Sequence, residues 1–216
     1  MKDFDFDMDA LVAQESARQR KAMALAAADP KLPYISALVI AGDLLAAERS
    51  LEWLREGKYP WRQAEAFCGS YGRLDLRVRA YAEGLITDAE VIEDLPAAWR
   101  SADPDDTDPR FLALWQQAFI ANGRRYLFDG KQLPKKATFP IYRGQDHGAP
   151  FGIAWSLDPE VAMKFADGAA TRQRGRGGVI YCAIAHRLDV MGYMTKRNEA
   201  EVIVDPVMLR DIEVWR

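Results

Sequence analysis

The sequence is poor in the residues that stabilise small secreted domains or bind metals. Its 216 residues include only two cysteines, Cys68 and Cys182, and two histidines, His147 and His186. There is no CxxC pair and no Cys/His spacing typical of a zinc site, so we expect no metal. Both thiols are expected to be reduced and packed, as in a cytoplasmic protein.

A long apolar run and a strong excess of one charge are also absent. No stretch approaches the roughly 20 apolar residues of a membrane-spanning helix, so we expect no membrane partner. The acidic N-terminus lacks the basic and apolar regions of a signal peptide. The net charge is −3, so the chain as a whole lacks the basic charge that is typical of nucleic-acid-binding proteins. With 49% hydrophobic and 28% charged residues, the chain is expected to be a folded soluble protein rather than a disordered one.

The first 130 residues have a mainly helical composition. Apolar periodicity, capping residues and helix breakers predict helices over residues 10–28, 36–55, 61–82 with a break near Gly69, 87–94 and 110–128. Thr87 and Glu90 have the spacing of a capping box. An acidic loop with two prolines, residues 102–109, precedes the last helix.

Three arginines, Arg73, Arg77 and Arg79, fall on one predicted helix. A solvated or ion-paired helix face is the simpler interpretation of this pattern. A nucleic-acid-binding module is the alternative, although the acidic balance of the chain argues against it.

The pattern changes after Gly130 to short strands separated by glycines. We expect strands at residues 138–142, 152–156, 179–184 and 201–204. One helix is predicted from Pro159 to Ala166, with Asp158 as its cap. Strands that are joined mostly by loops predict an antiparallel or mixed sheet. The sequence therefore predicts an α+β protein with a helical region over residues 1–130 and a β-rich unit over residues 131–216.

Two acids stand at the head of the last predicted strand. If Glu199 and Glu201 both belong to that strand, they project to the same side, about 7 Å apart along the chain. Two carboxylates on one face repel each other and resist burial. A solvated strand end is one interpretation, and a site that uses negative charge against a developing cation is the other.

Three short motifs follow one another at the edges of predicted strands: Tyr142-Arg143-Gly144, then Trp155-Ser156, then Glu199-Ala200-Glu201. In this order they resemble the mono-ADP-ribosyltransferases whose signature is arginine, serine and Glu-x-Glu. The resemblance covers about residues 138–216. It implies a small split β-sheet, a toxin-like transferase activity, and NAD as the substrate from which nicotinamide is released.

The resemblance also implies a role for each motif residue. Arg143 would hold a diphosphate oxygen or the adjacent ribose with its planar fork. Gly144 would let the backbone approach the nicotinamide amide. Glu201 would stabilise an oxocarbenium-like transition state, as in glycoside hydrolysis. Ser156 would donate to Glu201, and Glu199 would position or deprotonate the acceptor.

Aromatic residues near these motifs have two interpretations. Tyr142, Trp155 and Phe165 offer faces for the nicotinamide ring, and ordinary core packing is the alternative for each. Residues 191–198 correspond to the loop that selects the target in the family, with Tyr193 at its tip. A plain hairpin turn is the alternative for this segment.

The sequence does not identify the acceptor of the ADP-ribose group. It is a protein or a nucleic acid in the leading interpretation, and water if the protein is an NAD glycohydrolase. The serine motif matches only at Ser156, and the gap from Arg143 to Ser156 is 156 − 143 = 13 residues, where the family commonly places a helix. These departures favour a third interpretation, a non-catalytic interaction protein that keeps the same fold.

Overall fold

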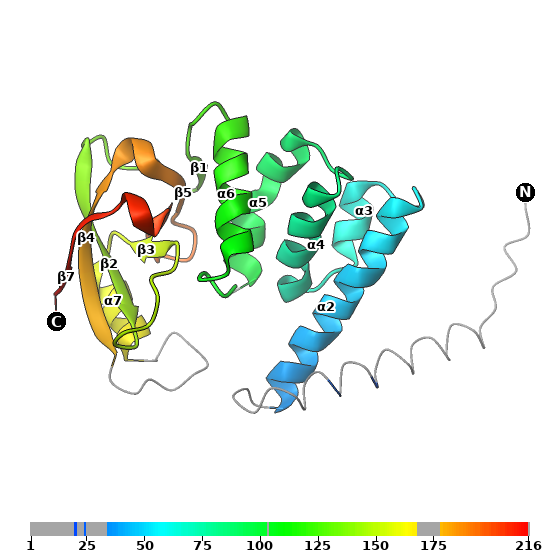
Figure 1. The fold of residues 1–216 in the computed structure, drawn as a ribbon, viewed down its shortest axis with the longest axis horizontal. Helices are drawn as coiled ribbons and strands as arrows, with labels where there is room; N and C mark the ends of the chain where they lie inside the picture. Colours follow the sequence, from blue (N-terminus) through cyan, green and yellow to red (C-terminus); the bar gives the residue numbers. More distant parts are fainter. Residues whose placement is uncertain (1–19, 21–23, 25–33, 103, 168–177, 216) are drawn as a thin grey trace, which may run out of the picture. The chain divides into compact units, whose positions relative to one another are not determined.

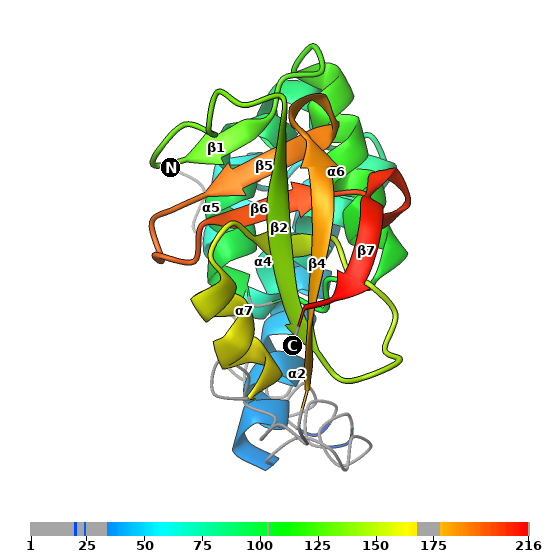
Figure 2. The ribbon, with the colours of Figure 1, turned by 90° about the vertical axis from the view of Figure 1, so that its left-hand side faces the viewer.

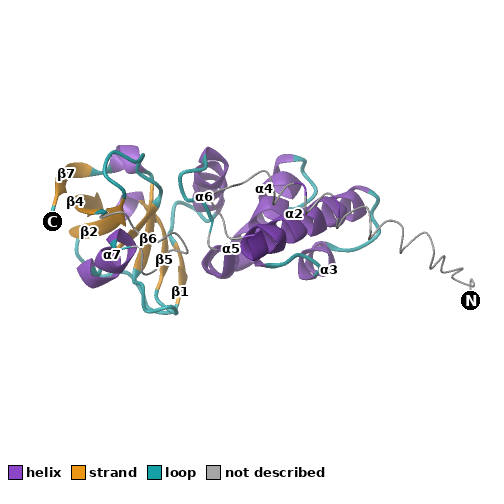
Figure 3. Ribbon diagram, turned by 90° about the horizontal axis from the view of Figure 1, so that it is seen from below, coloured by secondary structure: helices purple, strands orange, loops and turns teal. Residues whose placement is uncertain are grey.

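The fold was analysed on a computed structural model, which describes residues 20, 24, 34–102, 104–167 and 178–215. Helices dominate the N-terminal half and a seven-stranded mixed sheet the C-terminal half, which confirms the predicted α+β class (Figure 1; Figure 3). The chain divides into two compact units, Met1–Ala80 and Tyr81–Arg216. The helix predicted over residues 10–28 lies outside the described residues, apart from residues 20 and 24.

The first unit is built from α2 (Tyr34–Arg55), α3 (Trp61–Ala66) and α4, which runs from Ser70 to Ala82. The predicted break near Gly69 is confirmed. A Cβ atom on Gly72 would lie 2.2 Å from the backbone oxygen of Asp43, so this glycine lets α4 approach α2 closely. The carboxylate of Asp43 also accepts a hydrogen bond from the Tyr71 amide at 3.1 Å.

The three arginines of α4 are engaged within this unit. Arg77 is fully buried, forms an ion pair with Glu65, and lies 5.1 Å above the ring of Trp61. Arg79 pairs with Asp75 at 3.3 Å, and Arg73 Nε donates to the Cys68 carbonyl at 3.4 Å. These contacts support the ion-paired interpretation of the arginine pattern.

The second unit begins with two helices, α5 (Asp88–Ala102) and α6 (Pro109–Ala121). The capping box is present, because the Thr87 amide donates to Glu90 at 2.7 Å and the Glu90 amide donates to the Thr87 hydroxyl at 3.3 Å. Helix α5 continues beyond its predicted end because a buried apolar stripe follows: Leu95, Ala98, Trp99 and Ala102. Helix α6 ends earlier than predicted, since Gly123 and Arg124 adopt left-handed conformations (φ +66° and +56°).

The sheet has the strand order β1-β5-β6-β3-β2-β4-β7, and only the β1–β5 pair is parallel. Its strands are β1 (Leu127–Asp129), β2 (Thr138–Gln145), β3 (Ala154–Ser156), β4 (Val179–His186), β5 (Val190–Met194), β6 (Glu201–Val204) and β7 (Arg210–Val214). Helix α7 spans Pro159–Ala166 as predicted, with the Asp158 carboxylate capping its first turn. Two short 3-10 turns, η1 (Arg187–Asp189) and η2 (Pro206–Met208), follow β4 and β6.

The sheet is split between β2 and β3, which pair through one residue each, Tyr142 and Ser156. Figure 2 shows β1, β5 and β6 running across the direction of β2, β4 and β7. A shared apolar core joins the two halves, with Phe139 and Ile141 from one half and Trp155, Val202 and Tyr193 from the other.

Tyr193 is 6% exposed and lies within β5. The predicted role of Tyr193 as the exposed tip of a target-selecting loop is therefore wrong, because its ring is needed to fill the core.

The described residues also bear on membrane helices, disulfides and metal ligands. Within the described ranges, no helix has the combination of length and apolarity needed to cross a membrane. Both cysteines are free. The part of the chain that the structure describes contains no group of three metal-ligating side chains.

Candidate active site

The three predicted motifs lie on three neighbouring strands. β3 lies between β2 and β6, and the register aligns Tyr142 with Ser156 and Ser156 with Glu201. Residues paired across strands project to the same face of a sheet. Ser156 and Glu201 therefore share a face, next to the one pair that joins the two halves of the sheet.

Glu201 is held by a tryptophan from α5. The indole N–H of Trp99 donates to Glu201 Oε1 at 2.9 Å, across 102 residues of sequence. Burial raises the pKa of Glu201 from 4.5 to about 7, and the Trp99 hydrogen bond opposes this rise. The charges of Glu199 and Asp106 raise the pKa further. Near neutral pH this group therefore exchanges between carboxylic acid and carboxylate.

Ser156 holds the Glu-x-Glu segment by its backbone. Its hydroxyl donates to the Glu199 carbonyl at 2.5 Å and accepts from the Asp158 amide at 2.9 Å. The predicted bond from Ser156 to the Glu201 carboxylate is replaced by that from Trp99. The serine thus fixes the chain entering β6 to the turn before α7.

The two acids of the Glu-x-Glu motif do not belong to one regular strand. β6 begins at Glu201, and Ala200 adopts a left-handed conformation with φ of +45°. This conformation is unfavourable for alanine and is held here by a hydrogen bond from the Leu157 amide to the Ala200 carbonyl at 3.0 Å. Strand alternation therefore does not relate the directions of Glu199 and Glu201, in contrast to the sequence-based expectation.

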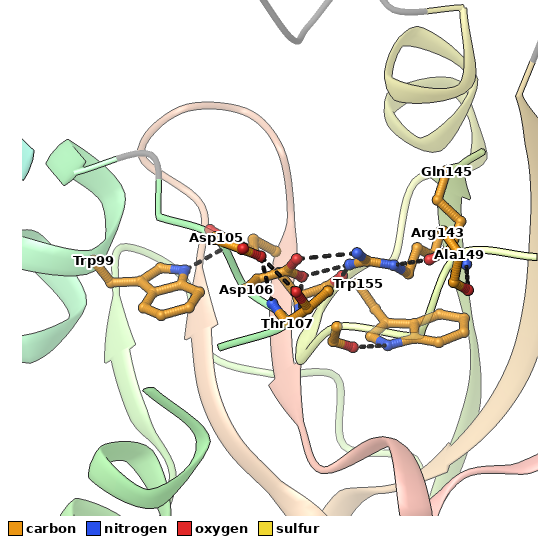
Figure 4. A network of polar contacts seen from close by, with 11 residues as sticks. Trp99, Asp105, Asp106, Thr107, Arg143, Gln145, Ala149 and Trp155 are labelled. Carbon is orange, nitrogen blue, oxygen red and sulfur yellow. Dashed lines mark hydrogen bonds and ion pairs between the residues drawn. The ribbon is translucent and has the colours of Figure 1, made fainter. Parts of the chain in front are cut away.

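Arg143 binds a carboxylate from the loop between α5 and α6 (Figure 4). Its Nη1 and Nη2 atoms donate to the two oxygens of Asp106 at 2.5 and 3.0 Å. Nη1 also donates to the Ala154 carbonyl at 2.6 Å, and Nε donates to Gln145 at 2.5 Å. The guanidinium is thus fixed at the end of β2, beside the start of β3.

Arg143 and Glu201 leave the sheet from different faces. Alternation along β2 places Arg143 with the buried Ile141, opposite Tyr142, whereas Glu201 shares a face with Ser156. Within the described part of the chain, no hydrogen bond or ion pair joins Arg143 to Glu201 directly. Both interact with neighbouring parts of the chain, Glu201 with Trp99 on α5 and Arg143 with Asp106 in the loop after α5.

Asp106 was not among the residues predicted for the site. Its Oδ2 atom accepts from the Ala154 amide at 3.0 Å, and its backbone carbonyl accepts from the Ile153 amide at 3.1 Å. A Cβ atom on Gly152 would lie 2.3 Å from its carboxylate. The sequence marked an acidic loop at this position, but no local pattern pairs this loop with an arginine 37 residues later.

The predicted aromatic residues contact the protein itself. Trp155 is 2% exposed, belongs to the core cluster, and donates from its indole N–H to the Gly152 carbonyl at 3.1 Å. Tyr142 packs beside α7 and contacts the Trp215 ring edge-on at 5.2 Å. Phe165 is half-buried on α7. Core packing therefore accounts for Trp155.

Gly144 has a structural reason to be glycine. A Cβ atom at this position would lie 1.9 Å from the Ala162 carbonyl oxygen and 2.5 Å from the Ala166 nitrogen. The backbone of α7 thus fills the space in the Cβ direction of Gly144, which is a packing reason for glycine here in addition to the predicted backbone approach to the nicotinamide amide.

Comparison of the chain with protein-family models, with curated proteins and with solved structures gave no significant match. The function is therefore inferred from the motifs and from the geometry of the site.

Proposed function

We propose that the protein is an NAD-dependent mono-ADP-ribosyltransferase that transfers ADP-ribose to a macromolecular acceptor and releases nicotinamide. The observation that carries the proposal is the adjacency of the three motif-bearing strands. Tyr142, Ser156 and Glu201 lie in one register row, and Arg143 follows directly on Tyr142. Motifs that are 13 and 45 residues apart in sequence (156 − 143 and 201 − 156) thus lie on adjacent strands. Because Arg143 and Glu201 leave the sheet from different faces, NAD must reach both faces at these strand ends.

The proposed reaction breaks the bond between the ribose C1′ atom and the nicotinamide nitrogen. Nicotinamide leaves with the bonding electron pair, which neutralises its ring, and positive charge develops on the ribose. The Glu201 carboxylate stabilises this charge and accepts a hydrogen bond from the 2′-hydroxyl. The nucleophile of the acceptor then bonds to C1′, and its proton passes to Glu199.

The environment of Glu201 suits this role. A carboxylate that has lost much of its hydration interacts more strongly with a nearby cation than an exposed one does. The Trp99 N–H fixes one carboxylate oxygen at 2.9 Å and orients the other. In this proposal Trp99 is the residue that positions the Glu201 carboxylate, a role that the resemblance implies for Ser156.

Release of nicotinamide from NAD tests the proposal. We expect Glu201→Gln to reduce the release rate by at least about a hundredfold, because the neutral amide cannot offset the developing charge. Glu213→Gln is the matched control, because Glu213 is an exposed strand carboxylate on β7. Equal rates for wild type and Glu201→Gln contradict the proposed role.

The acceptor is identified by mass spectrometry. A covalent increase equal to one ADP-ribose on a protein or nucleic acid identifies a transferase. Free ADP-ribose as the sole product identifies water as the acceptor and the protein as an NAD glycohydrolase.

A second candidate is a non-catalytic interaction protein with the same fold. The bidentate contact of Asp106 with Arg143 favours it, because the guanidinium proposed for NAD is already bound to a carboxylate. Calorimetry with millimolar NAD separates the candidates. Absence of binding to the wild type and to an Asp106→Ala variant favours the non-catalytic protein.

A further inference from the structure

We infer that the loop between α5 and α6 is an intramolecular inhibitor, in which the Asp106 carboxylate occupies the position of a substrate diphosphate oxygen on Arg143. NAD binding then requires this carboxylate to leave. The inference rests on the proposed function for the identity of the incoming anion. The site then has a closed state, in which Asp106 binds Arg143, and an open state, in which this contact is broken.

Most of the N–H groups of the Arg143 guanidinium are engaged in the closed site. Four of the five N–H groups of Arg143 are engaged, two of them by Asp106, one by Ala154 and one by Gln145. A bidentate arginine–carboxylate pair has the donor geometry that arginine also offers to phosphate. A diphosphate oxygen therefore cannot use this fork while Asp106 is bound to it.

A backbone amide completes the anion site. The Ala154 N–H donates to the same Asp106 oxygen that receives Arg143 Nη1. One oxygen thus has two donors from different strands, an arrangement suited to a phosphate oxygen as well as to a carboxylate. The donors belong to the sheet, whereas the acceptor is the side chain of a loop residue, so the carboxylate can turn away while the donor set and the bond from the Ile153 amide to the Asp106 carbonyl stay in place.

Helix α5, which precedes this loop, also contacts the proposed catalytic acid Glu201. Trp99 lies on α5, and Asp106 lies in the loop that follows α5. Trp99 contacts Glu201, and Asp106 contacts Arg143 as Figure 4 shows. The side chains of Arg143 and Asp106 remain 13% and 17% exposed, so an anion from solution can compete for the arginine without the core unfolding.

The expected consequence is a reduced affinity of the wild type for NAD. When a binding-competent state is only partly populated, the apparent affinity falls in proportion to its population. We expect Asp106→Ala to tighten NAD binding at least about tenfold in calorimetry. Asp105→Ala is the matched control, because Asp105 is exposed, carries the same charge, and binds Thr107 rather than Arg143.

Gly152 allows the same contact to be opened by steric means. A Cβ atom at residue 152 would lie 2.3 Å from three atoms of the Asp106 carboxylate, and Gly152 has no left-handed conformation that alanine would strain. Gly152→Ala should therefore expel the carboxylate while keeping its charge, and should also tighten NAD binding at least about tenfold. The double variant should bind no more tightly than either single variant, since both remove one contact.

Inorganic diphosphate is a probe that does not depend on the NAD reaction. It should raise the thermal midpoint of Asp106→Ala clearly more than that of the wild type, because the vacated guanidinium binds it. If Asp106→Ala does not fold, Gly152→Ala supplies the same comparison. Arg143→Lys in the Asp106→Ala background should remove the gain in affinity, because lysine lacks the bidentate fork.

The outcomes separate this inference from the proposed function. Wild-type affinities in both Asp106→Ala and Gly152→Ala overturn the inference, and the proposed function stands if these proteins release nicotinamide. Diphosphate binding that is strengthened by both substitutions, with no NAD binding, supports the inhibitory contact and overturns the proposed function. A gain equally large in Asp105→Ala overturns the inference, because a general charge effect then explains it.

Discussion

At the scale of single residues, the environment of Glu201 disfavours the charged form of its carboxyl group. Its carboxyl group has lost hydration, and the Trp99 N–H compensates only in part. Burial therefore raises its pKa to about 7 in the folded protein, above the value of 4.5 that describes the unfolded chain. The folded state binds more protons than the unfolded state between these two values.

This difference predicts how stability depends on pH. Both states are protonated below pH 4.5, so Glu201 has no effect there, and a penalty grows as the pH rises towards about 7. We expect Glu201→Gln to be about 2–3 kcal/mol more stable than the wild type above pH 7, and equal to it near pH 4.5. Thermal unfolding measured from pH 4.5 to pH 8 checks this. A difference that does not change with pH contradicts it.

The Trp99 hydrogen bond lowers the pKa of Glu201 and so opposes the effect of burial, which raises it. The Trp99 N–H stabilises the carboxylate, so Trp99→Phe should raise the pKa of Glu201 above about 7 while keeping a ring against Phe111 and Trp115. A carbon-NMR titration of the Glu201 carboxyl group measures this shift directly. If the site is active, the rise of nicotinamide release with pH should move to higher pH as well. An unchanged titration contradicts the role of Trp99.

At the scale of elements, the packing of α7 on β2 depends on Gly144. The nearest atoms to a Cβ at this position belong to the backbone of α7, so the helix must shift for a side chain to fit. This contact positions the last part of β2, which contains Arg143. The same glycine therefore supports the site through helix packing.

Gly144→Ala should destabilise the protein by about 2–3 kcal/mol, as expected for overpacking against backbone. Gly42→Ala is the matched control, because Gly42 lies within α2 with no heavy atom within 4 Å of its added Cβ. The control should gain about 0.5–1 kcal/mol from the higher helix propensity of alanine. Denaturant unfolding measures both, and a Gly144→Ala variant as stable as the wild type is the contradicting result.

At the scale of the whole molecule, the described residues of the candidate site belong to one compact unit. Tyr81–Arg216 contains the sheet, its apolar core, and the helices α5, α6 and α7. The sequence predicts that α5 and α6 belong to the helical region of residues 1–130. In the structure they share a compact unit with the sheet, and α5 and the α5–α6 loop supply Trp99 and Asp106 to the site.

We therefore expect residues 81–216 to fold when expressed alone, because the core of this unit is formed by its own strands. The fragment should unfold cooperatively, and its NAD affinity should lie within about threefold of that of the full chain. Circular dichroism and calorimetry check these two expectations. A fragment without a cooperative transition contradicts the independence of the unit.

The elements that could be predicted from the sequence have strong local signals. Helix α7 has Pro159 in its first turn and Asp158 as its cap, and β6 has a β-branched run that ends before a proline. The sequence does not predict β1, β5 or β7. β1 is only three residues long and pairs in parallel with β5, which is distant in sequence. Such pairing leaves no hairpin turn in the sequence.

The sequence by itself determined the α+β class, the order of the arginine, serine and Glu-x-Glu motifs, and the positions of Ser156 and Glu201 at strand ends, whereas β2 continues past Arg143 to Gln145. These features depend on local propensity and alternation, which a short window of residues contains. Only the tertiary structure decided what these residues contact. Trp99 and Asp106 reach Glu201 and Arg143 across 102 and 37 residues, because two packed helices bring their connecting loop to the split in the sheet.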